Sequence, residues 1–417
     1  MAGEIMKPFF PLLSIILLVV CGTLACRKER PMVAEKKSAL TETELREKAK
    51  RLAQQFIIVD THIDVPYRLM KKMEDISVRT EEGNFDYPRA KEGGLNVPFM
   101  SIYVPAEYEG KGAKAYADKL IDMVEGFARN WPEKFAIVTS VADIKAPFAE
   151  GKISLAMGME NGAPIEGDLE NLRHLYNRGI RYITLTHAKN NHISDSSYEQ
   201  DRRWHGLSPF GEQVVAEMNR LGIMVDVSHV SDEAFYQVME ISKAPVIASH
   251  SSCRSFTPGW ERNMSDEMIK LLASKGGVIH INFGSSFVND EYRRKSESIQ
   301  KHIDEYLKAN HLKRNDPAAQ AYIKKYQEEN PTGNISDVVA HIDHVARLVG
   351  VDHVGFGSDF DGVGDSLPYG LKDVSDYPNL IYELLKKGYS DEDIEKICSG
   401  NLLRLWSEVE RIARESK

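Results

Sequence analysis

The chain has 417 residues, enough for one large domain or two domains of ordinary size. Hydrophobic residues make up 42% of it and charged residues 28%, a composition typical of a globular protein with a sizeable core. The net charge of −9 and the lack of a basic patch interleaved with aromatic residues argue against nucleic acid or an anionic lipid surface as a partner.

The first 26 residues have the pattern of an export signal. Lys7 precedes an apolar stretch over residues 9–24, and a small residue and a cysteine, Ala25-Cys26, follow it. Thr23-Leu24-Ala25-Cys26 is an acceptable lipobox, so we predict a lipoprotein signal over residues 1–26, with Cys26 as the lipidated residue.

A charged and polar tether is predicted over residues 27–41, followed by a catalytic domain over residues 42–417. The protein would then be exported and held by its lipid on the periplasmic or extracellular side of a membrane. An ordinary cleaved signal and an uncleaved anchor are the alternatives, and Pro11 and the shortness of the apolar stretch disfavour the anchor.

Cysteine usage excludes a disulfide framework. The sequence has four cysteines, two of them in the signal, and we expect Cys253 and Cys398 to be buried free thiols, with a single bridge as the alternative. The hydrophobic core must therefore hold the fold.

Short apolar runs rich in β-branched residues alternate with helix-like stretches along the rest of the chain. This pattern indicates buried parallel strands joined by helices. Strands are predicted to end at His62, Val104, Glu160, His187, His229, His250, Phe283 and Asp359. Helices are predicted at 42–55, 112–129, 169–178, from 208, from 231, and at 266–274, 377–387, 391–398 and 401–414. Eight strands in βα alternation predict an α/β fold, a (β/α)8 TIM barrel.

Two segments depart from a minimal barrel. Residues 188–207 are long for a barrel loop and rich in Asn, Ser, Asp and His, which favours a place at the active site. Residues 285–334, between strands seven and eight, read as two charged amphipathic helices. We expect a solvated face there, with a lid over the pocket or a dimer contact as alternatives.

Polar residues at the carboxyl ends of barrel strands converge at one mouth of the barrel. His62 and Asp64 stand at i and i+2 of one strand, so both side chains can reach the same metal. His229 and His250 could hold a second metal, and Glu160 could give one oxygen to each. Six other histidines stand on helical or surface-like stretches and are not expected to bind metal: His174, His302, His311, His341, His344 and His353.

Several motifs resemble those of the membrane dipeptidase (renal dipeptidase) family, in the same order from residue 56 to residue 406. They are Val59–Asp64, Met157–Gly162, Asp226–His229, Ala248–Ser252, Gly357–Val363 and Gly400–Arg404. The resemblance implies a barrel of the metal-dependent amidohydrolase type that hydrolyses dipeptides with two zinc ions. The animal relatives are tethered by a glycolipid. The 285–334 insertion departs from these relatives, so the resemblance does not decide whether the protein forms a homodimer or whether the insertion is a lid.

The resemblance also implies a role for each site residue. His62 and Asp64 match the ligands of one zinc, Glu160 the bridge, and His229 and His250 the ligands of the other zinc.

Three further positions match residues that handle the substrate. His187 matches the histidine that steadies the oxyanion, and Asp359 matches the acid that shuttles the proton. On sequence alone a surface salt bridge with Glu261 or Asp266 is the favoured interpretation of Arg262. The resemblance reverses it, because Arg262 matches the arginine that grips the free carboxylate.

Two other functions compete with a dipeptidase. Another metal-dependent hydrolase on the same barrel, acting on cyclic amides or phosphotriesters, would usually open with His-x-His and use a bridging lysine, whereas this chain has His62-x-Asp64 and Glu160. A catalytically silent lipoprotein that binds peptides would be expected to have lost ligands, and every expected position is filled.

Overall fold

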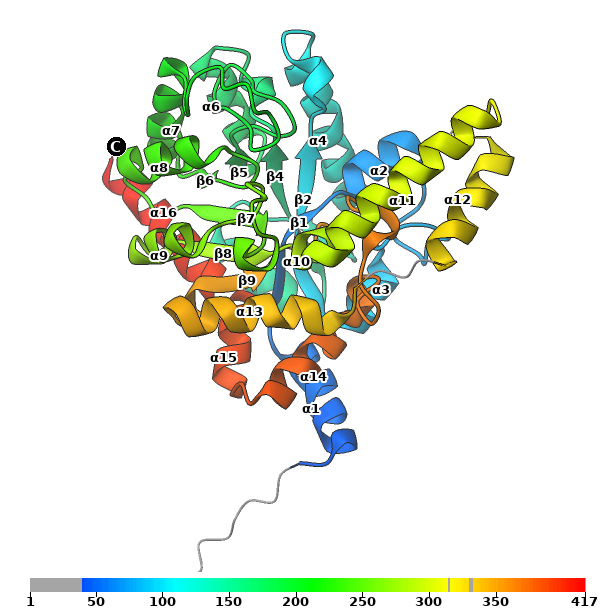
Figure 1. The fold of residues 1–417 in the computed structure, drawn as a ribbon. Coiled ribbons are helices and arrows are strands. Elements are labelled where there is room, and N and C mark those ends of the chain that lie inside the picture. Colours follow the sequence, from blue (N-terminus) through cyan, green and yellow to red (C-terminus); the bar gives the residue numbers. More distant parts are fainter. Residues whose placement is uncertain (1–39, 314–315, 330–332, 417) are drawn as a thin grey trace, which may run out of the picture. The chain divides into compact units, whose positions relative to one another are not determined.

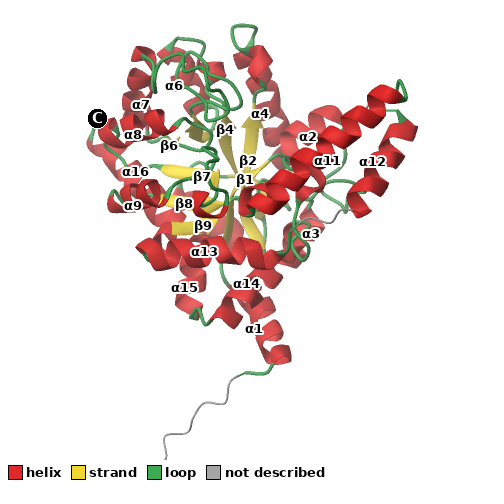
Figure 2. Cartoon of the chain, viewed as in Figure 1, coloured by secondary structure: helices red, strands yellow, loops and turns green. Residues whose placement is uncertain are grey.

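The computed structural model describes residues 40–313, 316–329 and 333–416. The predicted signal, with Cys26, and nearly all of the predicted tether lie outside these residues. Within them, parallel strands occupy the centre and helices surround them (Figures 1 and 2). The strands are β1 Ile58–Ile63, β2 Leu95–Tyr103, β3 Phe135–Ile137, β4 Ile153–Glu160, β5 Ile180–Thr184, β6 Met224–Asp226, β7 Ile247–Ser251, β8 Val278–Ile281 and β9 Val354–Phe356.

Eight of these strands form the predicted barrel. All pairs are parallel, in the order β1-β2-β4-β5-β6-β7-β8-β9, and the ring closes through a bridge between Ile63 and Phe360. The backbone N–H of Asp64 donates to the carbonyl of Phe360 (2.9 Å), and that of Asp359 donates to the carbonyl of His62 (3.0 Å). The closing bonds thus lie at the end of the barrel where the predicted ligands stand.

The helices follow the predicted alternation, and α13 and several short helices are present in addition to those predicted. They are α1 Glu42–Gln55, α2 Val65–Lys71, α3 Tyr87–Gly93, α4 Ala113–Asn130, α5 Lys145–Ala149, α6 Leu169–Asn177, α7 Pro209–Leu221, α8 Asp232–Ile241, α9 Asp266–Ser274, α10 Ser285–Val288, α11 Asp290–Ala309, α12 Pro317–Glu329, α13 Ile335–Val349, α14 Tyr377–Lys387, α15 Asp391–Glu395 and α16 Asn401–Glu415. Their starts have local causes: Ser208, for example, caps α7 by accepting from the N–H of Gly211 (2.9 Å), and Pro209 occupies the first turn.

The barrel interior is filled by side chains. Phe99 of β2 contacts both Tyr182 of β5 and Trp406 of α16, with ring centroids 5.5 Å apart in each case. Trp406 is fully buried, so the C-terminal helix contributes to the same core cluster as the strands. This packing leaves the opposite, carboxyl end of the strands for polar groups.

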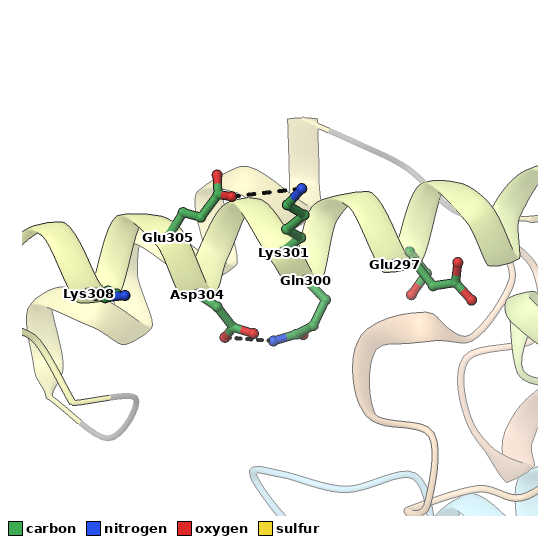
Figure 3. Close-up of a pocket in the computed structure, with 7 residues that line it drawn as sticks. Glu297, Gln300, Lys301, Asp304, Glu305 and Lys308 are labelled. Carbon is green, nitrogen blue, oxygen red and sulfur yellow. Dashed lines mark hydrogen bonds and ion pairs between the residues drawn. The ribbon is translucent and has the colours of Figure 1, made fainter. Parts of the chain in front are cut away.

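The insertion between β8 and β9 forms the two predicted helices, α11 and α12. They share a small core of their own, made of Ile303, Leu307, Ala319 and Ile323. The rings of Tyr306 and Tyr322 stack between them, with centroids 3.5 Å apart. A hollow of about 620 Å³ along α11 is lined by charged and polar side chains of that helix (Figure 3).

Candidate metal centre and active site

Strand register brings the predicted ligands to one level. Glu160, the last residue of β4, pairs with Tyr103 on one side and with Thr184 on the other, and Thr184 pairs with Asp226. His187, His229 and Asp359 each stand three residues beyond the end of their strand, β5, β6 and β9, so they lie at the start of each loop and not on the strand itself. His62 and His250 lie within β1 and β7.

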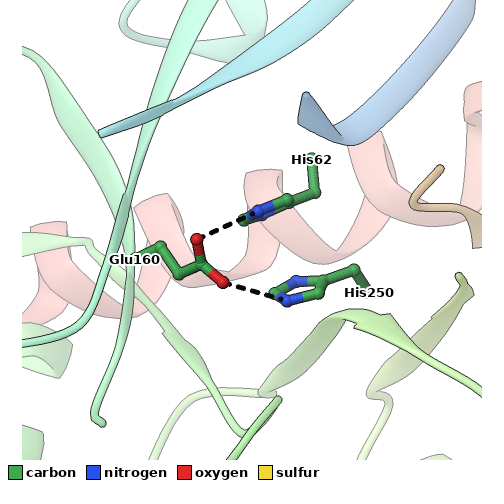
Figure 4. Close-up of side chains that lie close together, drawn as sticks. All are labelled: His62, Glu160 and His250. Carbon is green, nitrogen blue, oxygen red and sulfur yellow. Dashed lines mark ion pairs between the residues drawn. The ribbon is translucent and has the colours of Figure 1, made fainter. Parts of the chain in front are cut away.

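Glu160 is the centre of the cluster and is 5% exposed. Its Oε2 lies 3.4 Å from Nε2 of His62, and its Oε1 lies 3.3 Å from Nε2 of His250 (Figure 4). Nε2 of His229 and Nε2 of His187 lie 3.1 and 3.3 Å from the same Oε1. One carboxylate therefore faces four imidazoles, through both of its oxygens.

A second carboxyl group extends the cluster. Oδ2 of Asp64 lies 3.5 Å from Nε2 of His62, and Asp359 approaches the same two residues closely enough to share a cation with them. Within the described part of the chain, Nε2 of His62 and Oδ1 of Asp64 are buried without a hydrogen-bond partner. Buried polar atoms of this kind call for an explanation, and a bound cation is one.

The backbone makes room for this cluster at Gly362. A Cβ atom there would lie 2.2 Å from Oδ1 of Asp359 and 2.3 Å from Oδ2 of Asp64. Only glycine fits so close to two carboxylates, so the loop after β9 can fold down onto the site.

Although burial lowers it, the neighbouring Tyr182 and two carboxylates raise the pKa of His62 well above its usual value. Burial sets the charge of the other three histidines. It lowers the pKa of His187, and together with the positive charge of Arg262 it holds the pKa of His229 well below the usual value. Burial and the charge of His62 do the same to the pKa of His250. These rings are therefore neutral near pH 7, the form in which imidazole binds a metal.

Arg262 is buried, with 2% exposure, and points into the site. It donates to Oγ of Ser251 and to the carbonyl of His250, both at 2.8 Å, and its Nη2 lies 3.1 Å from Nε2 of His229.

The surface salt bridge that the sequence left open for this arginine is not formed. Glu261 pairs instead with Arg202, and Asp266 pairs with His344.

Several residues at the site have strained backbone conformations. His229 and Asp359 have φ values of 68° and 63°, in the left-handed region that non-glycine residues rarely adopt. Asn161, directly after Glu160, has φ 83°, and its side chain donates to the carbonyl of Val104 (2.8 Å). Strain of this kind is typical of functional sites.

A layer of polar residues behind the ligands was not predicted. The hydroxyl of Tyr182 lies 2.7 Å from Nδ1 of His62, and the ring of Tyr182 occupies the space that a Cβ atom of Gly158 would need. Asp60 accepts from the N–H groups of His62 (3.1 Å) and Ser358 (2.9 Å) and joins β1 to the loop after β9. Asp60 lies two positions before His62, and Tyr182 pairs in the sheet with Gly158, two positions before Glu160.

The histidines set aside in the sequence lie away from the cluster. His174 pairs with Asp118 (2.9 Å), and His344 pairs with Asp266 (2.8 Å). His341 is fully buried in α13, where its Nε2 donates to the carbonyl of Val288 (2.8 Å).

A family model described as "Membrane dipeptidase (Peptidase family M19)" matches residues 46–417. The chain belongs to the membrane dipeptidase family. The protein is therefore a dipeptidase, and its barrel mouth carries groups of side chains that could hold a metal ion.

Two curated dipeptidases illustrate the relationship. Dipeptidase 3 of Rattus norvegicus is 30% identical over 381 residues, which cover 89% of this chain and 69% of the relative. Dipeptidase aclJ of Aspergillus oryzae is 33% identical over 340 residues, which cover 80% of this chain and 71% of the relative.

Solved structures of dipeptidases share the fold. The probable dipeptidase PvdM from Pseudomonas aeruginosa has a TM-score of 0.76 and 28% identity, covering 89% of this chain and all of its own. A metallopeptidase from Rhodobacter sphaeroides, liganded with a phosphinate mimic of the dipeptide L-Ala-D-Ala, has a TM-score of 0.69 and 25% identity, covering 85% of this chain and 99% of its own. The membrane dipeptidase barrel predicted from the motifs is thus confirmed.

No helix among the described residues of this dipeptidase has both the length and the hydrophobicity needed to cross a bilayer.

Proposed function

We propose that this dipeptidase uses two zinc ions bridged by Glu160. His62 and Asp64 would complete one site, and His229 and His250 the other. The observation that carries the proposal is the position of Glu160. Its Oε2 faces His62, and its Oε1 faces the imidazoles of the three remaining site histidines.

The donor set fits zinc. Imidazole nitrogens and carboxylate oxygens are its usual ligands in hydrolytic sites, and hydrolytic zinc sites keep a position open for water. A pair of divalent cations bound here would supply the charge that polarises the scissile carbonyl and makes a water molecule acidic near neutral pH.

Asp359 would move the proton of the reaction. Burial, together with the nearby charge of Asp64, raises the pKa of Asp359 to about 7, and Nδ2 of Asn282 holds its Oδ2 at 2.8 Å. A carboxyl group with this pKa can take a proton from the attacking water and return it to the nitrogen of the leaving amine.

His187 would stabilise the oxyanion. Its ring is neutral, 19% of its side chain is exposed, and it stands beside Glu160 at the mouth of the site. A neutral imidazole N–H can donate to the carbonyl oxygen as negative charge develops there.

Arg262 would bind the free carboxylate of the substrate. Its planar guanidinium can pair with both oxygens of a carboxylate, which in a dipeptide lies one residue beyond the scissile bond. The dipeptide mimic bound by the Rhodobacter sphaeroides relative supports a substrate of this size. A longer peptide places a neutral amide at the same point and loses the charged contact.

We further propose that the enzyme is exported and tethered to a membrane by a lipid on Cys26, through residues 27–41. This rests on the sequence pattern, as does the boundary of the catalytic domain at residue 42. A homodimer through the α11–α12 insertion is the alternative to a solvated insertion. Mass spectrometry of the purified protein tests the anchor, because it detects whether the chain begins at an acylated Cys26.

Metal content and hydrolysis together test the proposed function. We expect two zinc ions per chain, release of free amino acids from a panel of dipeptides, and loss of this activity with a chelator. Glu160→Gln keeps the shape of the side chain but removes the charge that offsets two dications, so it should lose at least one metal and nearly all activity.

The matched control is Glu170→Gln, which changes a carboxylate with a side chain 71% exposed and should leave both properties unchanged. Glu160→Gln with unchanged metal content and turnover would defeat the bridge. Wild-type protein that binds dipeptides without cleaving them would favour the silent lipoprotein.

A further inference from the structure

A carboxylate that the proposed mechanism does not use lies directly behind His250. Asp226, the last residue of β6, is fully buried. Its Oδ1 accepts from the N–H groups of Ser228 (3.0 Å) and Ser249 (2.8 Å), and its Oδ2 accepts from the hydroxyls of Ser249 (2.7 Å) and Thr184. With four donors, this carboxylate has its hydrogen-bonding capacity filled and is unsuited to bind a metal itself.

The hydroxyl of Ser249 connects Asp226 to His250. Oγ of Ser249 lies 2.7 Å from Nδ1 of His250, and the hydroxyl has a single proton to donate. Because a bond to an ionised carboxylate is stronger than one to a neutral imidazole, that proton goes to Asp226. Oγ then offers a lone pair to His250, and Nδ1 must carry the hydrogen.

This arrangement determines which nitrogen of His250 can bind a metal. A neutral imidazole with its hydrogen on Nδ1 has a free lone pair on Nε2. Nε2 of His250 is the atom that lies 3.3 Å from Oε1 of Glu160, and 2.8 Å from Nε2 of His229.

We propose that Asp226 is a positioning residue that sets, through Ser249, the tautomer and the ring orientation of His250, so that Nε2 faces the metal centre with its lone pair free. The proposal rests on the proposed function, because it assigns Asp226 a role toward a ligand of that centre. Three neighbouring strands build the device, with Thr184 on β5, Asp226 on β6 and both Ser249 and His250 on β7.

The opposite arrangement shows what the charge of Asp226 contributes. If Ser249 donated to Nδ1 instead, the hydrogen of His250 would sit on Nε2 and could only donate to Glu160. Asp226 would then lose a charge-assisted bond in a buried site, which is costly. An amide at position 226 removes this preference, since its NH2 group can donate to Ser249 and turn the hydroxyl toward His250.

Two variants test the device by metal affinity. Asp226→Asn removes the charge at constant shape, and Ser249→Ala removes the connecting hydroxyl. Zinc affinity is measured by competition titration of metal-free protein, and loss of a partner behind a metal ligand typically costs about 10–100-fold. We expect a loss of this size at one of the two sites for both variants.

Matched controls change the same chemical groups elsewhere. Asp86→Asn alters a buried carboxylate that caps α3, and Ser154→Ala removes a hydroxyl from a buried serine of β4. Both should keep wild-type zinc affinity. Thermal unfolding of the metal-free variants separates stability from affinity, because a merely structural role would lower the melting temperature and leave the affinity unchanged.

A spectroscopic readout does not depend on the folding of the Asp226 and Ser249 variants. The metal-free wild-type protein is labelled with 15N-histidine, and the long-range 15N–1H correlations of His250 are assigned by their loss in His250→Gln. We expect these correlations to show the hydrogen on Nδ1. A hydrogen on Nε2 would overturn the proposal.

The titrations distinguish two kinds of failure. Unchanged zinc affinity in Asp226→Asn and Ser249→Ala overturns the role of Asp226 while the proposed function stands. Wild-type protein that binds no divalent metal overturns both. If Asp226→Asn does not fold, Ser249→Ala and the histidine spectrum decide.

Discussion

At the scale of single residues, the surroundings of Asp359 explain how one carboxyl group can both take and return a proton. It is 9% exposed and lies against Asp64, and its oxygen Oδ2 is held by Asn282. These surroundings bring its pKa to about 7, near the pH at which a general base is most effective.

Asp359→Asn should therefore leave both metals bound and lower kcat by about 10²–10⁴, the usual contribution of an acid–base group. The measurement is zinc content per chain together with single-turnover kinetics on one dipeptide. Because Asp359 lies close enough to His62 and Asp64 to share a cation with them, loss of zinc is the informative contrary result. It would make Asp359 a ligand.

Arg262 is the residue that should limit the substrate to two residues. Arg262→Ala removes a donor to a charged acceptor, worth about 1.5–3 kcal/mol, or roughly ten- to hundredfold in kcat/KM for a dipeptide. The loss should be much smaller for the corresponding dipeptide amide, which carries no charge at that end.

Comparing the dipeptide and its amide in wild type and variant forms a cycle that isolates this contact. Equal losses for the two substrates would mean that Arg262 acts through its bonds to Ser251 and His250, as a structural residue.

At the scale of elements, the contact between β4 and β5 positions His62. Tyr182 of β5 pairs with Gly158 of β4 in the sheet, and its ring lies over the glycine to reach Nδ1 of His62. A Cβ atom on Gly158 would lie 2.0 Å from the ring of Tyr182. The ring cannot move away easily, because it also packs on Phe99.

Gly158→Ala should thus destabilise the barrel by about 1–3 kcal/mol, the usual cost of overpacking, and weaken zinc binding at the site of His62. Urea unfolding and zinc titration measure the two effects. Gly126→Ala is the control, since its Cβ would meet its nearest neighbour at 3.8 Å within α4 and alanine favours a helix. A Gly158→Ala protein with wild-type zinc affinity would show that Tyr182 does not orient His62.

At the scale of the whole molecule, the sequence was sufficient to predict the barrel, while the roles predicted for the site residues stay predictions. The apolar strands and the polar residues near their ends are visible in the chain itself, and the predicted ligands lie in adjoining groups that share Glu160 or His62. The short strand β3 and the helices α2 and α3 were missed, because each is short and lacks a clear periodicity. Helix α13, of 15 residues, was also missed, although it is neither short nor without an apolar face.

The layer behind the ligands could not be predicted for a different reason. Asp226 and Tyr182 lie within buried strands, and their partners stand on neighbouring strands. Which residues meet depends on the register between strands, such as Thr184 opposite Asp226, and register is a property of the folded barrel.

Buried histidines also make stability depend on pH. Burial lowers the pKa of His341 to about 4, and its Nδ1 accepts from the N–H of Cys253 (2.9 Å) and so has no place for a proton. In the unfolded chain a histidine titrates near 6.5. Between these values the unfolded state binds more protons, so this contribution to stability is complete above about pH 6.5 and is lost as the pH falls toward about 4.

The expected size of this loss is about 3 kcal/mol at most. It is measured as the difference in unfolding free energy between wild type and His341→Gln, which removes the titrating group. As the pH is lowered from 7 to 4.5, the free energy of unfolding should fall more for wild type than for His341→Gln. A difference that stays constant with pH would show that His341 is protonated in the folded protein.

The central claim is that Glu160 bridges two metals, and diffraction from zinc-loaded crystals tests it most directly. Diffraction data are collected on the two sides of the zinc absorption edge. The anomalous difference maps calculated from them identify zinc by its own scattering. We predict two peaks per chain on either side of the Glu160 carboxylate, about 3.5–4 Å apart, one beside His62 and Asp64 and the other beside His229 and His250. A single peak, or two peaks that do not share Glu160, would contradict the account.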